Sequence, residues 1–326
     1  MAVYTDITDG DLDTFLAGFD LGAPLALKGI AEGIENSNFL LETEAGRYIL
    51  TIYERRVREE DLPYFITLMQ WLAGHGFPSP TPQADRTGKL LHRLRDKPAA
   101  LVSFLNGVSV HEPTVEHCRA AGEGLARLHL AAQGFPGHRA NGLGHDAWRP
   151  LYAGHEVDAE ALKPGLAARI AADLDELERD WPSGLPQGVI HADMFPDNVF
   201  FLHGKFAAVI DFYFACNDAL AYDLAVCLNS WCFDPAGELK RAHAHALLAG
   251  YEAVRPLTAI ERESLPLLSR GAALRFFLTR LIDWGSTPAG ALVKPKNPLE
   301  YEARLAFFRR PDFMLGLFET MSEDRV

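Results

Sequence analysis

Hydrophobic and polar residues follow a strand-like pattern over much of residues 1–105. Short apolar or alternating runs predict strands at 25–27, 38–41, 48–53, 89–95 and 99–105. A turn segment from Glu42 to Gly46 separates the second and third runs and predicts a hairpin. Apolar residues at helical spacing predict a short helix at 9–19 and a longer one at 59–75. This part of the chain is therefore expected to be a small antiparallel sheet with one packed helix, preceded by a short amphipathic helix.

The pattern changes after Asn106-Gly107, where helical periodicity begins to dominate. Thr114 is placed to cap a helix that runs to about Ala132, and residues 134–150, rich in Gly, Pro and His, are expected to form a loop. Further helices are expected at 159–181, 222–232, 238–254, 259–283 and 299–319. The fold class is therefore expected to be α+β, with a β-rich N-lobe over residues 1–105 and a mainly helical C-lobe over residues 106–326.

A polar loop lies between two apolar strands in the run from Val189 to Phe200, and a further apolar run ends in a carboxylate at Asp211. Asp193 and Asn198 stand on that loop, five positions apart. A carboxylate can accept the proton of an attacking hydroxyl, while an amide oxygen and a second carboxylate can hold the magnesium that clamps nucleotide phosphates. The spacing therefore favours phosphoryl transfer, although Asp193 would also suit a simple turn cap.

The spacing H-x-D-x-x-x-x-N followed by I-D-F resembles the protein-kinase-like superfamily. It is most similar to the small-molecule kinases that include aminoglycoside phosphotransferases, choline kinases and one type of homoserine kinase. The resemblance implies a bilobal kinase fold, ATP and Mg²⁺ as cofactors, Asp193 as the catalytic base, and Asn198 and Asp211 as metal ligands. It also implies that His191 and Asp223 support the catalytic loop. A metal-hydrolase reading of His191-x-Asp193 lacks a second His/Asp cluster.

The nucleotide site is expected in the N-lobe. The turn at 32–38 holds one glycine, so a G-x-G-x-x-G pattern fails, but the side chains of Asn36, Ser37 and Asn38 could line the phosphates. A plain strand-connecting turn explains the same residues. Ile49 is expected to cover the adenine. Backbone groups of the expected hinge would read its edge, unless the segment is only a core strand; these residues are Ser103, Phe104 and Leu105.

Position 51 departs from the pattern of the superfamily. The resemblance predicts a phosphate-binding lysine there, and this chain has Thr51. By strand alternation, Ile49 and Thr51 face the cleft while Leu50 and Ile52 face the core. The usual ion pair from the lysine to the next helix is then in doubt. Either another cation substitutes, with Arg47 the nearest candidate, or magnesium carries more of the charge.

Four segments resemble the homoserine kinase branch: 32–38, 210–216, 228–233 and 270–284. The resemblance implies that the substrate is an amino alcohol, L-homoserine. A zwitterion needs a guanidinium for its carboxylate and a carboxylate or aromatic ring for its ammonium. The candidates are Trp231, Arg275, Arg280, Asp283 and Trp284. A solvated or intramolecular ion pair between Arg280 and Asp283 is the alternative. Choline- or aminoglycoside-type kinases and a non-catalytic nucleotide-binding protein remain as rivals.

Composition and charge argue against several classes of binding partner. The net charge of −13 argues against a nucleic-acid partner, because no basic surplus exists to neutralise phosphates. No apolar stretch approaches a membrane span, no signal peptide is evident at the N-terminus, and the four cysteines lack zinc-binding spacing. The chain is expected to be cytoplasmic and to be a monomer or a homodimer.

Overall fold

The computed structural model describes all residues except 1–3, 31–35, 55–56, 287–294, 311–316 and 318–326. The chain divides into two compact units. The first unit comprises residues 1–107, 134–139 and 207–213, and the second comprises residues 108–133, 140–206 and 214–326. The first unit therefore contains two short segments from later parts of the sequence, one of which carries Asp211.

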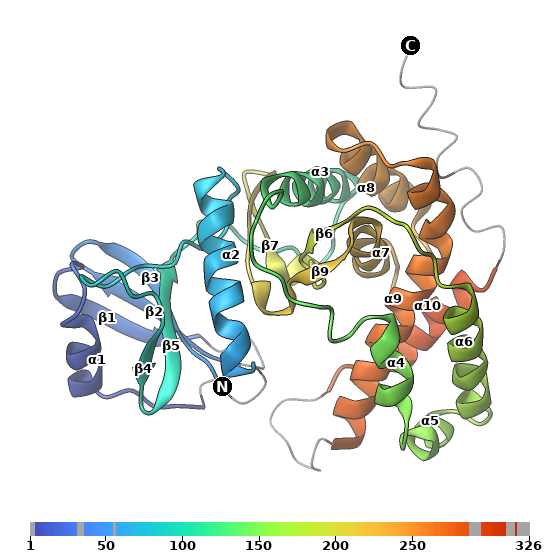
Figure 1. The fold of residues 1–326 in the computed structure, drawn as a ribbon, viewed down its shortest axis with the longest axis horizontal. Helices are drawn as coiled ribbons and strands as arrows, with labels where there is room; N and C mark the ends of the chain where they lie inside the picture. Colours follow the sequence, from blue (N-terminus) through green and yellow to red (C-terminus); the bar gives the residue numbers. More distant parts are fainter. Residues whose placement is uncertain (1–3, 31–35, 55–56, 287–294, 311–316, 318–326) are drawn as a thin grey trace. The chain divides into compact units, whose positions relative to one another are not determined.

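The first unit is built on a five-stranded antiparallel sheet with the order β1-β2-β3-β5-β4 (Figure 1). Its strands are β1 (Pro24–Gly29), β2 (Ser37–Thr43), β3 (Gly46–Ile52), β4 (His92–Leu94) and β5 (Lys97–Ser103). Thr43 pairs with Gly46, which confirms the hairpin that the turn segment predicts. The last hairpin differs from expectation. Arg95 and Asp96 both have positive φ, 52° and 59°, and form a two-residue turn, so β5 begins at Lys97 and not at Ala99.

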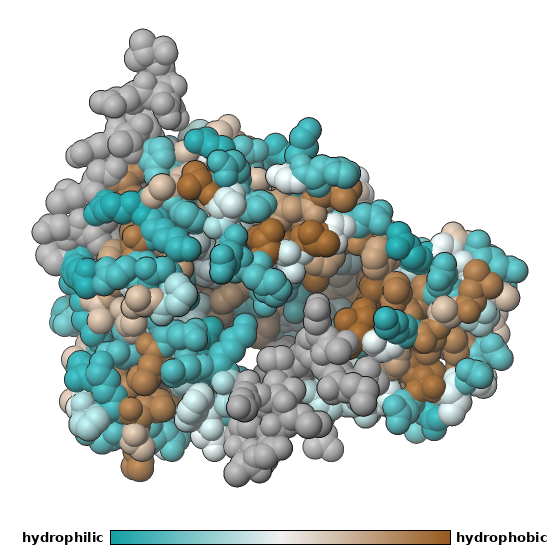
Figure 2. Space-filling view, turned by 180° about the vertical axis from the view of Figure 1, so that it is seen from behind, coloured by the Kyte–Doolittle hydropathy of each residue, from teal (hydrophilic) through white to brown (hydrophobic). Residues whose placement is uncertain are grey.

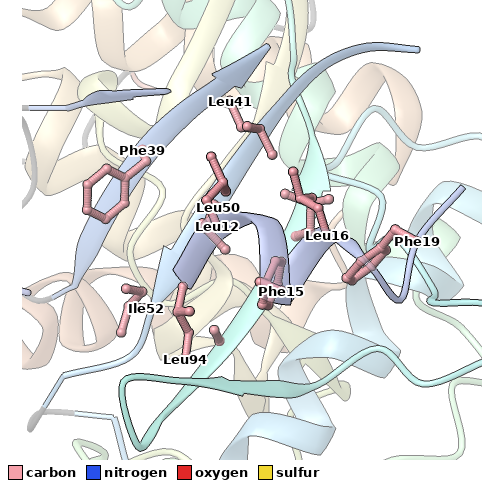
Figure 3. Packing of buried hydrophobic residues seen from close by; sticks show 11 residues of the cluster. Leu12, Phe15, Leu16, Phe19, Phe39, Leu41, Leu50, Ile52 and Leu94 are labelled. Atoms are coloured by element: carbon pink, nitrogen blue, oxygen red, sulfur yellow. The ribbon is translucent and has the colours of Figure 1, made fainter. Parts of the chain in front are cut away.

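Helix α1 (Asp9–Leu16) covers one face of this sheet, and α2 (Leu62–Gly74) follows a 3₁₀ turn at Glu59–Asp61. Figure 3 shows the α1 side chains gathered against those of the strands. The buried cluster consists of Leu12, Phe15, Leu16, Phe19, Phe39, Leu41, Leu50, Ile52, Leu94, Ala99 and Leu101. Burying each large apolar side chain contributes about 1.5–3 kcal/mol, so this cluster stabilises the unit. The expected core orientation of Leu50 and Ile52 is confirmed.

The second unit is mainly helical. Its helices are α3 (Val115–Ala131), α4 (His145–Tyr152), α5 (Glu156–Leu162), α6 (Leu166–Asp180), α7 (Leu220–Trp231), α8 (Arg241–Val254), α9 (Ala259–Ser286) and α10 (Leu299–Phe308). Figure 1 shows α3 and α8 side by side. A Cβ on Gly122 would lie 2.0 Å from the carbonyl oxygen of Leu247, and one on Gly250 would lie 2.1 Å from that of Arg119. Glycine at both positions therefore allows this close helix contact.

Two short sheets complete the described structure. β6 (Gln187–Ile190) pairs with β9 (Cys216–Ala219), and β7 (Val199–Leu202) pairs with β8 (Lys205–Val209). β9 was not expected, because its sequence carries Asn217 and Asp218, which disfavour strands. Its pairing with β6 overrides that preference.

Three helix expectations need correction. The expected loop at 134–150 contains the start of α4, with Asp146 in its first turn. The expected helix at 159–181 is two helices, α5 and α6, which Pro164 and Gly165 separate; Gly165 has a φ of 75°. The expected helix at 299–319 ends at Phe308, and most of its later part lies outside the described residues.

None of the described helices is both long and apolar enough to cross a membrane. Many hydrophilic residues spread over the face seen in Figure 2, with smaller hydrophobic patches between them. The α+β fold class predicted from the hydrophobic pattern is confirmed.

Candidate active site

The catalytic loop leaves β6 at Ile190, and its backbone is held by a buried carboxylate. The N–H groups of His191 and Ala192 donate to the Asp223 carboxylate at 2.7 Å and 2.8 Å. Asp223 lies in the first turn of α7 and is fully buried. Ala192 has a φ of 61°, a conformation that non-glycine residues seldom adopt. The two hydrogen bonds stabilise this turn immediately before Asp193.

Asp223 is also the end of a buried hydrogen-bond chain. His129 of α3 donates from Nε2 to Asp223 at 3.1 Å, and its Nδ1 lies 2.8 Å from the Tyr251 hydroxyl of α8. Arg255 donates to that hydroxyl at 2.9 Å. Burial raises the pKa of Asp223, but the hydrogen bond and charge of His129 and the backbone of His191 outweigh burial, so this pKa lies below its ordinary value. The carboxylate therefore stays ionised as an acceptor.

Asp193 and Asn198 are linked to each other within the loop. The Asn198 amide donates from Nδ2 to the Asp193 carbonyl oxygen at 2.9 Å and to the Asp193 carboxylate at 3.3 Å. The Asp193 N–H donates to His191 Nδ1 at 3.2 Å. Asp193 and Asn198 are both half-buried. Because Nδ2 faces Asp193, the amide oxygen of Asn198 is turned away from that carboxylate.

Two residues that the sequence predicts as substrate contacts, Trp231 and Arg275, instead donate hydrogen bonds to backbone carbonyl groups of the catalytic loop. The Trp231 indole N–H donates to the Met194 carbonyl oxygen at 2.8 Å. Arg275 donates from Nη1 to the Ala192 carbonyl oxygen. Both side chains are only 2% exposed. Trp231 is therefore a positioning residue in this structure, and Arg275 has a positioning role whatever else it binds.

The remaining substrate candidates lie further along α9. Arg280 donates to Glu300 at 2.6 Å and to the Asn297 carbonyl oxygen at 3.2 Å. Asp283 is half-buried and Trp284 is 44% exposed near the end of the helix. Nine residues of helix separate Arg275 from Trp284, a rise of roughly 14 Å. One small ligand does not span that distance, so the structure does not bring the five candidates together.

Asp211 belongs to the first unit and lies two residues beyond Val209, the end of β8. Its φ is 63°, again an unusual value for a residue with a side chain. The hydroxyls of Tyr53 and Tyr213 lie 3.1 Å apart. Burial raises the pKa of Tyr213 to about 12, while a hydrogen bond from Tyr53 opposes the rise and the Asp211 charge adds to it. The Asp211 carboxylate therefore lies near this hydroxyl pair at the end of β3.

Thr51, at the position of the missing lysine, is buried in the same unit and donates to the Asn38 Oδ1 at 2.8 Å. The acids that precede α2 each have an arginine partner within this unit. Glu59 pairs with Arg93 at 2.7 Å, Glu60 pairs with Arg58, and Asp61 pairs with Arg139 at 3.1 Å. The carboxylates that would receive a lysine from β3 are thus already engaged.

Arg47, the expected substitute cation, contacts Asn106 and Phe104. Its guanidinium donates to Asn106 at 3.0 Å and lies 4.4 Å from the centre of the Phe104 ring. Arg47 is four residues from Thr51 along β3, which corresponds to about 13 Å. This distance argues against a direct replacement of the lysine.

Two of the residues expected to contact the nucleotide, Ser37 and Asn36, make hydrogen bonds within the first unit. Ser37 is buried, accepts from the N–H groups of Tyr4 and Thr5, and donates to Glu54 at 2.8 Å. Asn36 is also buried, and its Oδ1 accepts from the Glu54 N–H at 3.3 Å. These two side chains therefore tie the start of β2 to the end of β3. Residues 32–35 of the expected phosphate turn lie outside the described residues.

Two of the three expected hinge residues, Ser103 and Phe104, use their backbone N–H groups within the first unit. Ser103 donates from its N–H to the Thr81 carbonyl oxygen at 2.9 Å, and Phe104 donates to the Arg47 carbonyl oxygen at 3.2 Å. Ile49 is half-buried on the same strand face as Thr51. The expected contacts of Ile49, Ser103, Phe104 and Leu105 with the adenine stay predictions.

The model of the phosphotransferase enzyme family matches residues 26–257. A homoserine kinase of Caulobacter vibrioides (strain NA1000 / CB15N) is 66% identical over 310 residues, which cover 95% of this chain and 98% of that relative. A homoserine kinase of Phenylobacterium zucineum (strain HLK1) is 65% identical over 316 residues, which cover 97% of this chain and 98% of that relative. The chain belongs to the homoserine kinases of this family.

The fold has solved counterparts. The structure of an amicoumacin kinase in complex with AMP-PNP, Ca²⁺ and Ami superposes with a TM-score of 0.66 at 16% sequence identity. The match covers 98% of this chain and 94% of that one. The predicted bilobal, protein-kinase-like fold is therefore confirmed, and membership of the family agrees with it.

The two residues that the sequence nominates as metal ligands, Asn198 and Asp211, belong to different units, and each carries an oxygen that suits a hard divalent cation. The amide oxygen of Asn198 faces away from Asp193, and Asp211 supplies a full carboxylate charge. Mg²⁺ is typically held in kinases by one or two such oxygen side chains together with substrate phosphates. His129 and Tyr251, which the sequence analysis did not assign, belong to the support of this site. The only signal for them was a histidine on an apolar helix face.

Proposed function

We propose that this chain transfers the γ-phosphoryl group of ATP to the side-chain hydroxyl of L-homoserine. The product is O-phospho-L-homoserine, an intermediate of threonine biosynthesis. The observation that carries the proposal is the loop in which Asn198 holds Asp193 and Asp223 holds the backbone before it. The identity of 66% to a homoserine kinase over nearly the whole chain supports the choice of substrate.

Asp193 has the catalytic role. Its carboxylate orients the hydroxyl of the substrate and accepts the proton as oxygen attacks the γ-phosphorus. Asn198 fixes this carboxylate through Nδ2, and its amide oxygen and the Asp211 carboxylate would hold the metal. Magnesium bound with ATP would neutralise charge that develops on the transferred phosphoryl group. The residues around Asp193 position it: the two backbone hydrogen bonds from His191 and Ala192 to Asp223 stabilise the turn before Asp193.

The substrate class is tested by an ADP-release assay with purified protein, ATP and magnesium. The panel is L-homoserine, L-serine, choline and kanamycin. We expect turnover with L-homoserine at a kcat/KM at least tenfold above each of the others, since a site built for one amino alcohol leaves polar groups unpaired with another. Equal or higher kcat/KM with choline or kanamycin would overturn the assignment. ADP release with no hydroxyl substrate above background would point to the non-catalytic alternative.

A further inference from the structure

Two arginines of the second unit, Arg275 and Arg304, have no carboxylate partner within the described part of the chain. Arg275 is 2% exposed and donates to one carbonyl oxygen, that of Ala192. Arg304 is half-buried. The Nε atoms of both are buried, with no hydrogen-bond partner among the described residues. A buried guanidinium is costly unless an anion compensates it, so this pair calls for a bound anion.

The other arginines that face buried carboxylates in this unit are all paired. The pairs are Arg255 with Glu261, Arg262 with Glu252, Arg270 with Asp173, and Arg309 with Asp173. The fold therefore neutralises its structural arginines with its own acids. Arg275 and Arg304 are exceptions to that rule, which separates them from structural ion pairs.

The two exceptions converge on Tyr301 of α10. The Arg304 guanidinium lies 4.2 Å from the centre of the Tyr301 ring. Arg275 lies 4.3 Å from the centre of the Phe276 ring, and the Phe276 and Tyr301 rings are 5.2 Å apart. Tyr301 is fully buried, and its hydroxyl has no hydrogen-bond partner among the described residues. Two guanidinium groups and one hydroxyl thus provide unused donors in one cluster.

This cluster lies beside the catalytic loop. Arg275 binds the carbonyl oxygen of Ala192, the residue before Asp193, and the Phe195 ring packs 4.9 Å from that of Phe276. Burial raises the pKa of Tyr301; the charges of Arg304, Arg280 and Arg275 oppose the rise, and the charge of Asp193 adds to it. Asp193 is therefore within electrostatic range of the cluster. An anion bound there would sit next to the proposed base.

We propose that Arg275, Arg304 and the Tyr301 hydroxyl bind the α-carboxylate of the amino alcohol substrate. The proposal rests on the proposed function and adds the group that distinguishes an amino acid from a simple alcohol. A carboxylate accepts the fork of a guanidinium and a hydroxyl proton at the same time. The short carbon chain of homoserine requires its carboxylate site to neighbour the base, and this cluster meets that requirement.

Arg304 is the position to vary, because Arg275 also holds the loop. The variants are Arg304→Met, which keeps an unbranched apolar stem and removes the guanidinium, Arg304→Lys, which keeps a charge, and Tyr301→Phe, which removes only the hydroxyl. Arg310→Met is the matched control, since Arg310 is exposed and 3.7 Å from Glu238. Thermal unfolding of each variant checks that the fold persists.

We expect Arg304→Met to raise the KM for L-homoserine roughly 10- to 100-fold, the loss typical of a hydrogen bond to a charged group. Arg304→Lys should recover part of the affinity, and Tyr301→Phe should raise KM roughly fivefold. The KM for ATP should stay constant in all three. The ratio of kcat/KM for L-homoserine over propanolamine, its decarboxylated form, should fall by the same factor as the affinity. Arg310→Met should change none of these values.

Several outcomes overturn the proposal. An equal loss toward L-homoserine and propanolamine would make Arg304 a structural residue. A rise in the KM for ATP, with that for L-homoserine constant, would assign the cluster to nucleotide phosphates. Calorimetric titration separates this proposal from the proposed function. Wild type that binds L-homoserine but releases no ADP keeps the carboxylate site and overturns the kinase assignment. Wild type that binds propanolamine as tightly as L-homoserine overturns the site.

Discussion

The buried carboxylate of Asp223 offers a sharp test of how the catalytic loop is held. Asp223→Ala removes the acceptor of three hydrogen bonds: from the N–H groups of His191 and Ala192 and from His129 Nε2. The side chain is fully buried, so water does not replace the lost partners without entering the core. We expect the variant to be less stable and to lose the turn that positions Asp193.

The size of the effect follows from these contacts. A hydrogen bond to a charged group contributes about 1.5–3 kcal/mol, and each buried donor left without a partner costs about 1–3 kcal/mol. Three such losses that share one site amount to roughly 3–6 kcal/mol in the free energy of unfolding. Domains are stable by about 5–15 kcal/mol, so the variant should fold with a much reduced denaturation midpoint. Turnover should fall roughly 100-fold or more, because small displacements of a catalytic group have effects of that order.

Urea denaturation followed by circular dichroism measures the change in stability. Asp85→Ala is the matched control, because Asp85 also accepts three hydrogen bonds, from the N–H groups of Thr87 and Lys89 and from the Thr87 hydroxyl, but in a surface turn. It should cost much less stability than Asp223→Ala, because water can replace the lost partner. A loss below about 1 kcal/mol for Asp223→Ala, or equal losses for both variants, would refute the buried-network account.

The stability of the fold should depend on pH because the pKa of Asp223 is lowered. Burial raises this pKa, but the interaction with His129 outweighs burial. A group with a lowered pKa in the folded state contributes stability above its unfolded pKa and loses it as the pH falls through its folded pKa. The stability difference between wild type and Asp223→Asn should therefore be complete above about pH 4 and shrink at lower pH. A difference that instead grew on acidification would contradict this sign.

The remaining predictions concern the reacting groups. Asp193→Asn should fold and bind ATP normally while turnover falls roughly 10²–10⁴-fold; near-normal turnover would remove Asp193 from its role. Asp211→Ala should weaken magnesium-dependent nucleotide binding, measured by calorimetry, more than Asn198→Ala does, since a full charge is lost; equal and negligible effects would place the metal elsewhere. Thr51→Lys should not lower the KM for ATP, because Thr51 is buried and an ammonium there must be desolvated. A clear gain in kcat/KM for ATP would show instead that the site merely lacks a cation.

The candidate chemistry was readable from the sequence because it is local. Asp193 and Asn198 share one loop, and Asp211 follows a strand a short distance later, so their spacing is visible in the sequence and carries the resemblance that implies their roles. The alternation of Leu50 and Ile52 likewise identifies the core face of β3 without tertiary information. The second interpretation uses only the periodicity of a strand, whereas the first also depends on the resemblance to the small-molecule kinases.

The residues that hold the catalytic loop in place could not be predicted in the same way. His129 and Asp223 are 94 residues apart, and His129 and Tyr251 are 122 apart, so no spacing rule connects them. Trp231 and Arg275 look like ligand-binding residues by type, but their burial under the loop is a tertiary fact. The break between α5 and α6 at Gly165 is different, since Pro164-Gly165 is a recognisable stop signal that the helical periodicity obscured.

Phosphorus NMR of the complete reaction tests the central claim most directly. Wild-type protein is incubated with ATP, magnesium and L-homoserine, and the product is followed without any coupling enzyme. The account predicts a new phosphomonoester signal that is coupled to the side-chain methylene protons of homoserine and grows in step with ADP. ADP that accumulates with inorganic phosphate alone, or phosphate attached to another group of the substrate, would contradict it.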